Sequence, residues 1–281
     1  MPVPYRRRQL VAVLIAAGVM GLVWGLASGA PDDEPTGRPA LEVPKPSPRP
    51  PPPHRRPTAV DRALRYTGYV KRGSPRRREV ALTFDDGPSR YTPRLVKALR
   101  RVHASATFFP VGYAITAYDR QFQLLRRRGY PIGDHTMNHP LLSEFPAARQ
   151  AAEIDGQARL LRQSRVPYPR LFRPPYGGFD AATLALLHQR RMLMVLWSVN
   201  PEDYYRPGTR AIVRRVMGGV KPGAIVLLHD GGGDRSQTVA AVPRIVRKLR
   251  ARGYRVVSVP RLLADDPPPR HQGPPPNLAG L

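Results

Sequence analysis

Short apolar runs alternate with longer amphipathic segments between residues 79 and 263, and this alternation limits the fold to a few classes. Seven runs are predicted strands: 80–84, 106–111, 132–135, 171–173, 192–197, 224–228 and 255–259. Six helices are predicted between them: 92–102, 119–128, 147–164, 180–189, 209–220 and 239–252. Strands that alternate with helices form parallel sheets, so we expect an α/β fold, either a β/α barrel or a doubly wound sheet.

An uncharged apolar stretch, residues 10–30, precedes this region and follows a cluster of three arginines at 6–8. As a helix it would be about 31 Å long, close to the ~30 Å hydrocarbon core of a bilayer. The basic cluster predicts that residues 1–9 are cytoplasmic and that the rest of the chain is extracytoplasmic. We favour a membrane anchor over a cleaved signal peptide, because the run exceeds the about 7–15 apolar residues usual for a signal.

Proline-rich segments flank the predicted α/β domain. Eleven of the 27 residues from 31 to 57 are proline, which removes backbone donors and favours an extended chain. We therefore expect a linker at 31–78, a folded domain at 79–263 and a disordered tail at 264–281.

The chain is strongly basic, with 46 Lys and Arg residues against 20 Asp and Glu and a formal charge of +26. Such a field favours anionic partners such as phospholipid head groups, phosphate-rich wall polymers or nucleic acid. An arginine-rich proteome explains the charge equally well. We find no interleaved aromatic and basic residues of the kind that bind single-stranded nucleic acid, so no specific nucleic-acid partner is expected.

Two adjacent carboxylates, Asp85 and Asp86, follow the first predicted strand. Active sites of βα folds lie at the carboxyl ends of the strands. Adjacent side chains point to different sides, so one carboxylate could bind a metal while the other acts as a base. An ordinary Asp-Gly turn is the alternative interpretation of this segment.

Two histidines, His135 and His139, follow another predicted strand four residues apart. On one helical turn both rings would face the same way, as a divalent metal requires. The chain has no cysteine, so a zinc site would have to use His and Asp. Two histidines, one aspartate and water would make an open, catalytic metal site.

Candidate site residues also lie at the end of three further predicted strands or directly after them. They are Arg173, Pro175 and Tyr176 in the segment RPPYG, Trp197, Asn200 and Asp203 in WSVNPEDY, and Leu228 and His229 in LLHD. Each segment is weak evidence alone, because Pro-Tyr-Gly also predicts a turn and a strand-end histidine is often structural.

Taken in order, these segments resemble the motifs of the NodB-homology polysaccharide deacetylases, carbohydrate esterase family 4. The segment TFDDGP at 83–88 matches the first motif, HTMNHP at 135–140 the second and RPPYG at 173–177 the third, while LLH at 227–229 resembles the fifth. The resemblance covers residues 79–262 and implies the distorted (β/α) barrel of that family.

The resemblance also implies a reaction, the metal-dependent hydrolysis of N-acetyl groups on a polysaccharide. Zn²⁺ is the expected metal, with Co²⁺ or another transition metal as alternatives. The resemblance implies that Asp86, His135 and His139 are metal ligands, that Asp85 is the base with Arg173 as its partner, and that His229 is the acid. It also implies that the backbone N–H of Tyr176, beside Pro175, binds the oxyanion. Trp197 and Leu228 would be apolar walls or ordinary core.

The fourth motif departs from the family pattern. Many members carry an aspartate that pairs with the acid histidine, whereas this chain has Asn200. An amide can orient His229 by a hydrogen bond, but it cannot raise the imidazolium pKa by charge attraction. Asp203 is the nearby residue that could take over this role.

The substrate polymer is left open by these motifs. Peptidoglycan is our first expectation, because a short spacer beyond a membrane anchor reaches the cell wall, and chitin-type oligosaccharides are the second. An O-acetyl xylan esterase of the same family, or an inactive tethered protein that binds anionic wall polymers, are the alternatives.

Overall fold

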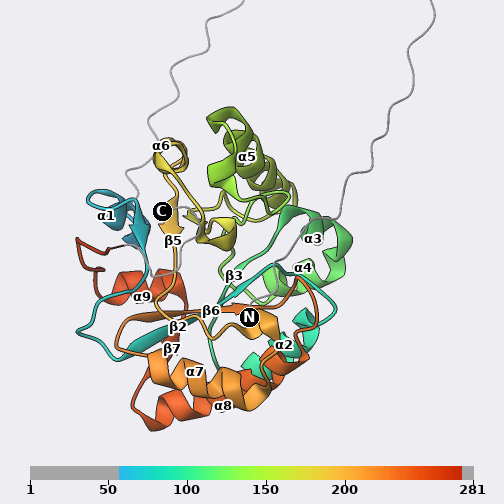
Figure 1. The fold of residues 1–281 in the computed structure, drawn as a ribbon, viewed down its shortest axis with the longest axis vertical. Coiled ribbons are helices and arrows are strands. Elements are labelled where there is room, and N and C mark those ends of the chain that lie inside the picture. Colours follow the sequence, from blue (N-terminus) through green and yellow to red (C-terminus); the bar gives the residue numbers. More distant parts are fainter. Residues whose placement is uncertain (1–56, 274–281) are drawn as a thin grey trace, which may run out of the picture. The chain divides into compact units, whose positions relative to one another are not determined.

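The computed structural model describes residues 57–273 (Figure 1). The predicted cytoplasmic segment 1–9, the predicted anchor 10–30 and most of the predicted linker lie outside the described residues. Within 57–273, no helix combines the length and the apolar character needed to cross a membrane.

Two parallel sheets form the centre of the folded unit. The first contains β2 (Glu79–Asp85), β3 (Thr107–Phe109) and β6 (Ala224–His229) in the order β3-β2-β6, and β7 (Arg255–Val257) pairs with the start of β2. The second contains β1 (Tyr69–Val70), β4 (Leu171–Phe172) and β5 (Leu193–Val195) in the order β1-β5-β4. β2 is buried along its whole length, which explains its nearly continuous apolar sequence.

Isolated bridges link the two sheets on both sides. Phe108 bridges to Ile132, and Asp134 bridges to Phe172, so residues 132–134 connect β3 to β4. On the other side, Val199 after β5 bridges to Val226 in β6. The predicted strand at 132–135 is thus reduced to two single bridges, one to β3 and one to β4.

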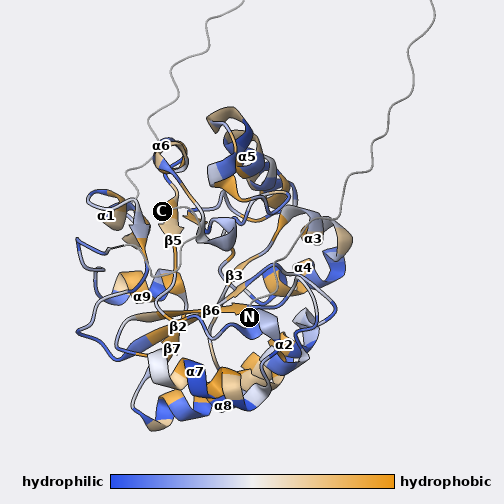
Figure 2. Ribbon diagram, in the orientation of Figure 1, coloured by the Kyte–Doolittle hydropathy of each residue, from blue (hydrophilic) through white to orange (hydrophobic). Residues whose placement is uncertain are grey.

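The six predicted helices are all present, with ends within three residues of the predicted ones. They are α2 (Thr92–Arg101), α4 (Asp119–Arg127), α5 (Ala147–Gln163), α6 (Ala181–Gln189), α7 (Thr209–Gly219) and α8 (Ser236–Ala251). The shorter helices α1 (Ala59–Leu64), α3 (Gly112–Ala117) and α9 (Val259–Asp265) are additional. Figure 2 shows β2 and β6 in apolar colours, with α7 and α8 banded polar and apolar beside them.

The folded unit begins before residue 79, where the sequence places the domain boundary. Val60 and Ala63 of α1 and Val70 of β1 are buried in one cluster with residues of β5 and α9. The sequence does not indicate this earlier start, because a six-residue helix and a two-residue strand give a weak apolar pattern. Elements this short depend on packing against segments distant in the chain.

The fold also extends beyond the predicted domain end at 263. Gln272 is buried, and its side-chain oxygen accepts hydrogen bonds from the backbone N–H groups of Lys71 and Arg72. Its side-chain nitrogen donates to the carbonyl of Arg72. The first part of the predicted disordered tail is therefore packed beside β1.

Candidate active site

The polar side chains that follow the strands meet at one edge of the sheets. Asp85 is the last residue of β2, and its register partner on the neighbouring strand β6 is His229. Adjacent strands lie about 4.8 Å apart, so this register places the two residues next to each other. Arg173 directly follows β4 and reaches the same edge.

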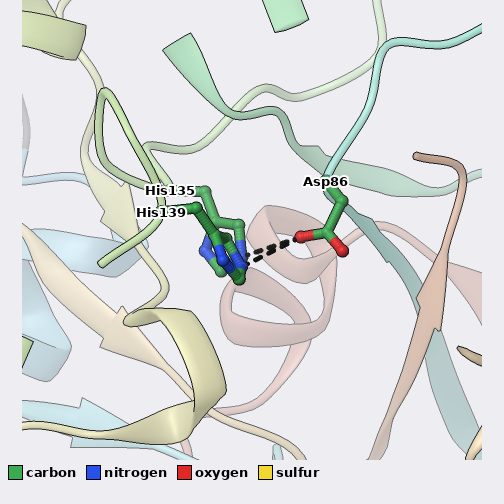
Figure 3. Close-up of side chains that lie close together, drawn as sticks. All are labelled: Asp86, His135 and His139. Atoms are coloured by element: carbon green, nitrogen blue, oxygen red, sulfur yellow. Dashed lines mark ion pairs between the residues drawn. The ribbon is translucent and has the colours of Figure 1, made fainter. Parts of the chain in front are cut away.

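Asp86, His135 and His139 form a compact group of possible metal ligands. Their donor atoms all lie within 4.8 Å of one another. Oδ1 of Asp86 is 3.1 Å from Nε2 of His139 and 3.4 Å from Nε2 of His135. Figure 3 shows both rings directing a nitrogen atom toward this carboxylate. We call these three residues the metal-site triad.

The tautomer of His135 follows from its hydrogen bond. Nδ1 lies 2.6 Å from the backbone carbonyl oxygen of Arg173, which can only accept, so Nδ1 carries the proton. The lone pair of Nε2 is therefore left to face Asp86. The backbone N–H of His135 donates to Oε1 of Gln157 on α5, which further holds the residue in place.

The two histidines lie in a loop, so the predicted helical turn between them is wrong. Thr136 and His139 have positive φ angles of 67° and 59°, and Oγ1 of Thr136 accepts the His139 backbone N–H. Asp86 and Tyr176 also have positive φ angles, of 67° and 60°. Such conformations cost roughly 1–3 kcal/mol each and cluster at functional sites, so the rings are brought together by strained loops rather than by helical spacing.

The metal-site triad fits a divalent cation. Oδ1 of Asp86 is buried and has no hydrogen-bond partner, although it faces the two imidazole nitrogens. An acceptor oxygen that faces an imidazole lone pair needs a positive charge between them. Two nitrogen donors and one oxygen are a donor set that suits Zn²⁺ at a catalytic site with an open position.

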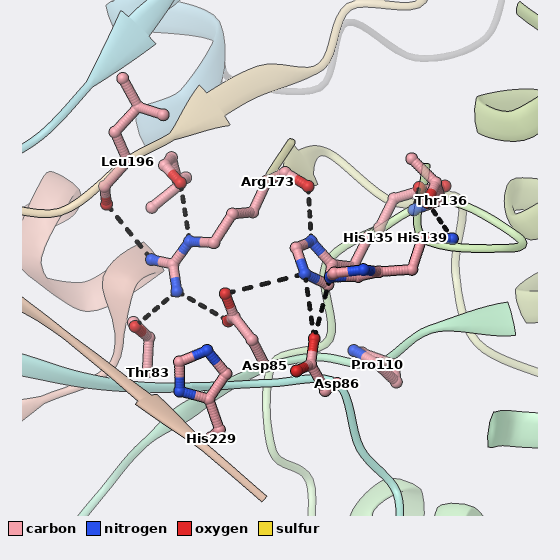
Figure 4. A network of polar contacts seen from close by, with 12 residues as sticks. Thr83, Asp85, Asp86, Pro110, His135, Thr136, His139, Arg173, Leu196 and His229 are labelled. Atoms are coloured by element: carbon pink, nitrogen blue, oxygen red, sulfur yellow. Dashed lines mark hydrogen bonds and ion pairs between the residues drawn. The ribbon is translucent and has the colours of Figure 1, made fainter. Parts of the chain in front are cut away.

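Asp85 is held by a buried arginine beside this triad. Nη1 of Arg173 lies 2.7 Å from Oδ1 of Asp85 and 2.7 Å from Oγ1 of Thr83, while Nε and Nη2 donate to backbone carbonyls of Val195 and Leu196. Figure 4 shows this network. Burial lowers the pKa of Arg173, and the charge of Asp85 opposes that shift. The other oxygen of Asp85 is 3.9 Å from Nε2 of His135.

His229 pairs with Asp203, and not with Asn200. Nδ1 of His229 is 2.8 Å from Oδ1 of Asp203, whose Oδ2 accepts from the His229 backbone N–H and from Thr238 on α8. Burial alone would lower the pKa of His229, but the charge and hydrogen bond of Asp203, with the charges of Asp86 and Asp85, raise it to about 9.

Asn200 is exposed and turned to its own loop. Its side chain accepts from the Glu202 backbone N–H and donates to the Tyr204 hydroxyl. Of the two alternatives for the partner of His229, Asp203 makes the contact and Asn200 does not, because a short 3-10 turn at Asp203–Tyr205 brings the later carboxylate to the imidazole.

Leu228 does not line the site, contrary to one of our two interpretations. It is fully buried among the core side chains of β2 and the outer helices, as is its register partner Phe84. Side chains alternate along a strand, so Leu227 shares the side of His229 and Leu228 points the opposite way. Trp197 does lie near the site, with its ring 5.8 Å from the guanidinium carbon of Arg173.

Pro175 and Tyr176 lie in a 3-10 turn after β4. Pro175 is buried, whereas the Tyr176 side chain is 59% exposed and its ring packs edge-on against His139 at 4.7 Å. This contact places the Tyr176 ring next to His139 of the metal-site triad.

Three supporting residues escaped the sequence analysis. Gln157 and Thr238 lie on helices far along the chain from the groups they hold, so no local pattern indicates them. Asp230 is buried behind the site against Gly87 and accepts from Thr92. Burial and the charges of Asp86 and Asp85 raise the pKa of Asp230 to about 7. The only sequence signal for Asp230 is its position directly after His229.

The fold and the site together define a class of hydrolase. A buried carboxylate and a paired imidazole lie on neighbouring strands beside a candidate metal site, which is an arrangement suited to general base and general acid catalysis. Comparison with known proteins gives the family.

The sequence profile of the polysaccharide deacetylase family matches residues 72–195. A peptidoglycan-N-acetylglucosamine deacetylase of Bacillus cereus is 40% identical over 205 residues, covering 71% of this chain and 95% of that protein. A chitooligosaccharide deacetylase of Bradyrhizobium sp. is 39% identical over 202 residues, covering 66% of this chain and 90% of that protein.

Solved structures agree with these relatives. The crystal structure of a peptidoglycan N-acetylglucosamine deacetylase, Bc1960, in complex with a naphthalenyl N-oxidanyl-benzamide has a TM-score of 0.68 and 29% identity. The match covers 71% of this chain and 94% of that one. The chain therefore belongs to the polysaccharide deacetylases of carbohydrate esterase family 4.

Proposed function

We propose that the chain is a metal-dependent N-deacetylase of cell-wall glycan, with peptidoglycan as its first substrate class and chitin-type oligosaccharides as its second. The observation that carries the proposal is the Arg173–Asp85 ion pair, at 2.7 Å, directly beside the metal-site triad. The names of the relatives support an N-acetylated glucosamine polymer as the substrate.

In this proposal Asp86, His135 and His139 bind the metal, and Asp85 acts as the base. A divalent ion supplies Lewis acidity, which polarises an acetyl carbonyl and makes water easier to deprotonate. Asp85 accepts the proton of the attacking water, and Arg173 keeps the carboxylate oriented through its fixed fork of donors.

On the neighbouring strand His229 donates a proton to the departing amine. Its ion pair with Asp203 favours the imidazolium form that an acid requires. The family resemblance adds the backbone N–H of Tyr176 as a donor to the developing oxyanion, next to Pro175. Trp197 is the remaining candidate for an apolar wall beside the acetyl methyl group.

Zn²⁺ is the metal we propose, because the donor set of two imidazoles and one carboxylate is typical of catalytic zinc. The parallel sheets, linked on both sides, support a distorted (β/α) barrel as the description of the fold. The apolar segment 10–30 and the basic residues before it support an extracytoplasmic catalytic domain with a membrane anchor.

The proposal is tested by acetate release from peptidoglycan, chitooligosaccharide and acetylated xylan, each with and without a chelator. Release from the first two that stops on chelation is the expected result. Release from xylan alone would favour the O-acetyl esterase instead, and the absence of release from all three would favour an inactive binding protein.

Two matched variants test the division of roles. We expect Asp85→Asn to lower turnover about 10²–10⁴-fold while the protein keeps its metal, because it removes a general base but preserves shape. Asp86→Asn should lower the metal content itself. The exposed Asp119 on α4 provides the control variant Asp119→Asn. Equal metal loss in Asp85→Asn and Asp86→Asn would contradict the assignment.

A further inference from the structure

The outer helices α2, α7 and α8 carry a cluster of cations without acids. They contain eleven arginines and lysines and no aspartate or glutamate. Helix α8 packs against both α2 and α7, and all eleven side chains are exposed. We call this set the cationic face: Arg94, Lys97, Arg100, Arg101, Arg210, Arg214, Arg215, Arg244, Arg247, Lys248 and Arg250.

An arginine-rich composition does not explain this distribution. Every other described α-helix that carries a lysine or arginine also carries an acid, namely Asp61 in α1, Asp119 in α4, Glu153 in α5 and Asp265 in α9. A bias that acted on the whole sequence would place acids on the outer layer too. The separation of charge is therefore specific to α2, α7 and α8.

Helix stability explains only part of it, because four of the eleven cations lie in the last turns of α2 and α8, where the helix dipole favours them, and the others do not. Among the described residues, only Arg215 of the cationic face has a carboxylate within 4.0 Å, at 2.7 Å from Glu202. Arg210 lies in the first turn of α7, where the helix dipole disfavours a cation. Arg210 with Arg214, and Arg244 with Lys248, are like-charged pairs four residues apart, which destabilise a helix.

A groove of about 830 Å³ runs between α7 and α8 within this face. Arg210 and Arg214 line it from α7, Arg244 and Lys248 line it from α8, and Arg252 lies after the end of α8. Val213, Met217, Gly218 and Ala251 complete the lining. None of these residues belongs to the candidate active site, so the groove is a separate feature of the surface.

We propose that this groove binds a linear phosphate polymer that lacks nucleobases, such as a phosphodiester-linked anionic polymer. Arginine forks match the geometry of phosphate oxygens, and cations on both walls can grip a strand that lies between them. A flat bilayer would meet only the outermost charges. The lining contains no aromatic side chain, so it offers no platform for stacked bases.

The groove holds the protein on an anionic polymer without taking part in the reaction. This role is independent of the proposed deacetylase chemistry, because it needs neither the metal-site triad nor Asp85.

The test measures binding of inorganic polyphosphate to the full 281-residue chain in a non-ionic detergent, over a series of salt concentrations. The groove variant carries Arg214→Gln, Arg244→Gln and Lys248→Gln. The control variant carries Arg120→Gln, Arg127→Gln and Arg162→Gln, three exposed arginines of α4 and α5. Both lose three charges, so they share any general loss of attraction.

Counterion release predicts the size of the effect. Each lost phosphate contact lowers the slope of log affinity against log salt by about 0.7 for a single strand, hence by about 2 for the groove variant. Over a fourfold rise in salt, the affinity of the parent should then fall by a factor about 16 times larger than the affinity of the groove variant. The control variant should keep the parental slope.

Three outcomes would overturn the proposal. They are equal slopes in the groove and control variants, no binding of polyphosphate by the parent, and tighter binding of oligo-dT or of monomeric short-chain phosphatidylglycerol than of polyphosphate. Unchanged thermal unfolding of both variants excludes misfolding as a cause. The milder Arg214→Lys should bind between the parent and the groove variant, because it keeps the charge but loses the fork.

Discussion

Replacing Asp203 by asparagine should move the alkaline limit of activity to lower pH. In the proposed reaction His229 must be protonated to donate to the departing amine, so activity falls as pH rises through its pKa. Asp203 is almost fully buried and lies 2.8 Å from Nδ1 of His229. Asp203→Asn removes the charge and keeps the size of the side chain.

The structure sets the magnitude. The pKa of His229 rises from 6.5 to about 9 against the opposing effect of burial, which corresponds to about 3 kcal/mol in favour of the imidazolium. Asp203 supplies the largest favourable charge and a hydrogen bond, and the charges of Asp86 and Asp85 supply the rest. An adjacent opposite charge is worth about 1–3 pKa units, so we expect the alkaline limb to fall by at least about one pH unit.

The assay is kcat/KM against pH on a soluble chitooligosaccharide, for the parent, Asp203→Asn and Asn200→Asp. Asn200→Asp is the matched control, because Asn200 is exposed and bonds only to Glu202 and Tyr204. Its alkaline limb should coincide with that of the parent. The position of the limb, and not the absolute rate, is the readout, since Asp203→Asn also disturbs the hydrogen bond from Thr238. An unmoved limb in Asp203→Asn, or a limb raised by Asn200→Asp, would refute this reasoning.

Two further predictions concern the metal and the buried ion pair. His135→Ala should lose both the metal and turnover, because two remaining protein ligands hold a divalent ion poorly. Metal analysis checks this, and the control is His188→Ala, at an exposed histidine. Full metal content in His135→Ala would contradict the prediction. Arg173→Met should lower the free energy of unfolding by about 3–5 kcal/mol, because it leaves the buried Asp85 without its partner. Denaturant unfolding measures this loss, and the added change Asp85→Asn should restore part of it; a double variant no more stable than Arg173→Met would show that the loss comes from packing alone.

The helices, the main strands and the candidate site motifs can be predicted from the sequence because their signals are local. Six helices are predicted to within three residues at each end, because helix-forming composition and apolar spacing are local to each segment. Asp85 and Asp86 follow a long buried strand, so the carboxyl end of β2 was visible as a candidate site. The alternation along β6, which turns Leu228 away from the side of His229, is equally local, although both interpretations of Leu228 were left open.

The geometry of the histidine pair and the start of the domain depend on which distant segments pack together. For these features the local patterns gave a wrong prediction or none. The rings of His135 and His139 converge through a strained loop held by Arg173 and Gln157, although their spacing suggested a helical turn. The short elements α1 and β1 are stable only by packing on β5 and α9, so the domain start was placed too late.

The partner of His229 shows most clearly the difference between what the sequence predicts and what tertiary contacts decide. The sequence leaves Asn200 and Asp203 as alternatives, and a 3-10 turn at Asp203 together with Thr238 on α8 brings Asp203 to the imidazole. Residue types and periodicities are properties of a segment, and they limited the chemistry to base, acid and metal ligands. Hydrogen-bond partners are properties of the packed chain, because they require atoms of separate elements to lie about 3 Å apart. The cationic face likewise depends on tertiary structure, because it exists only where α8 packs against α2 and α7.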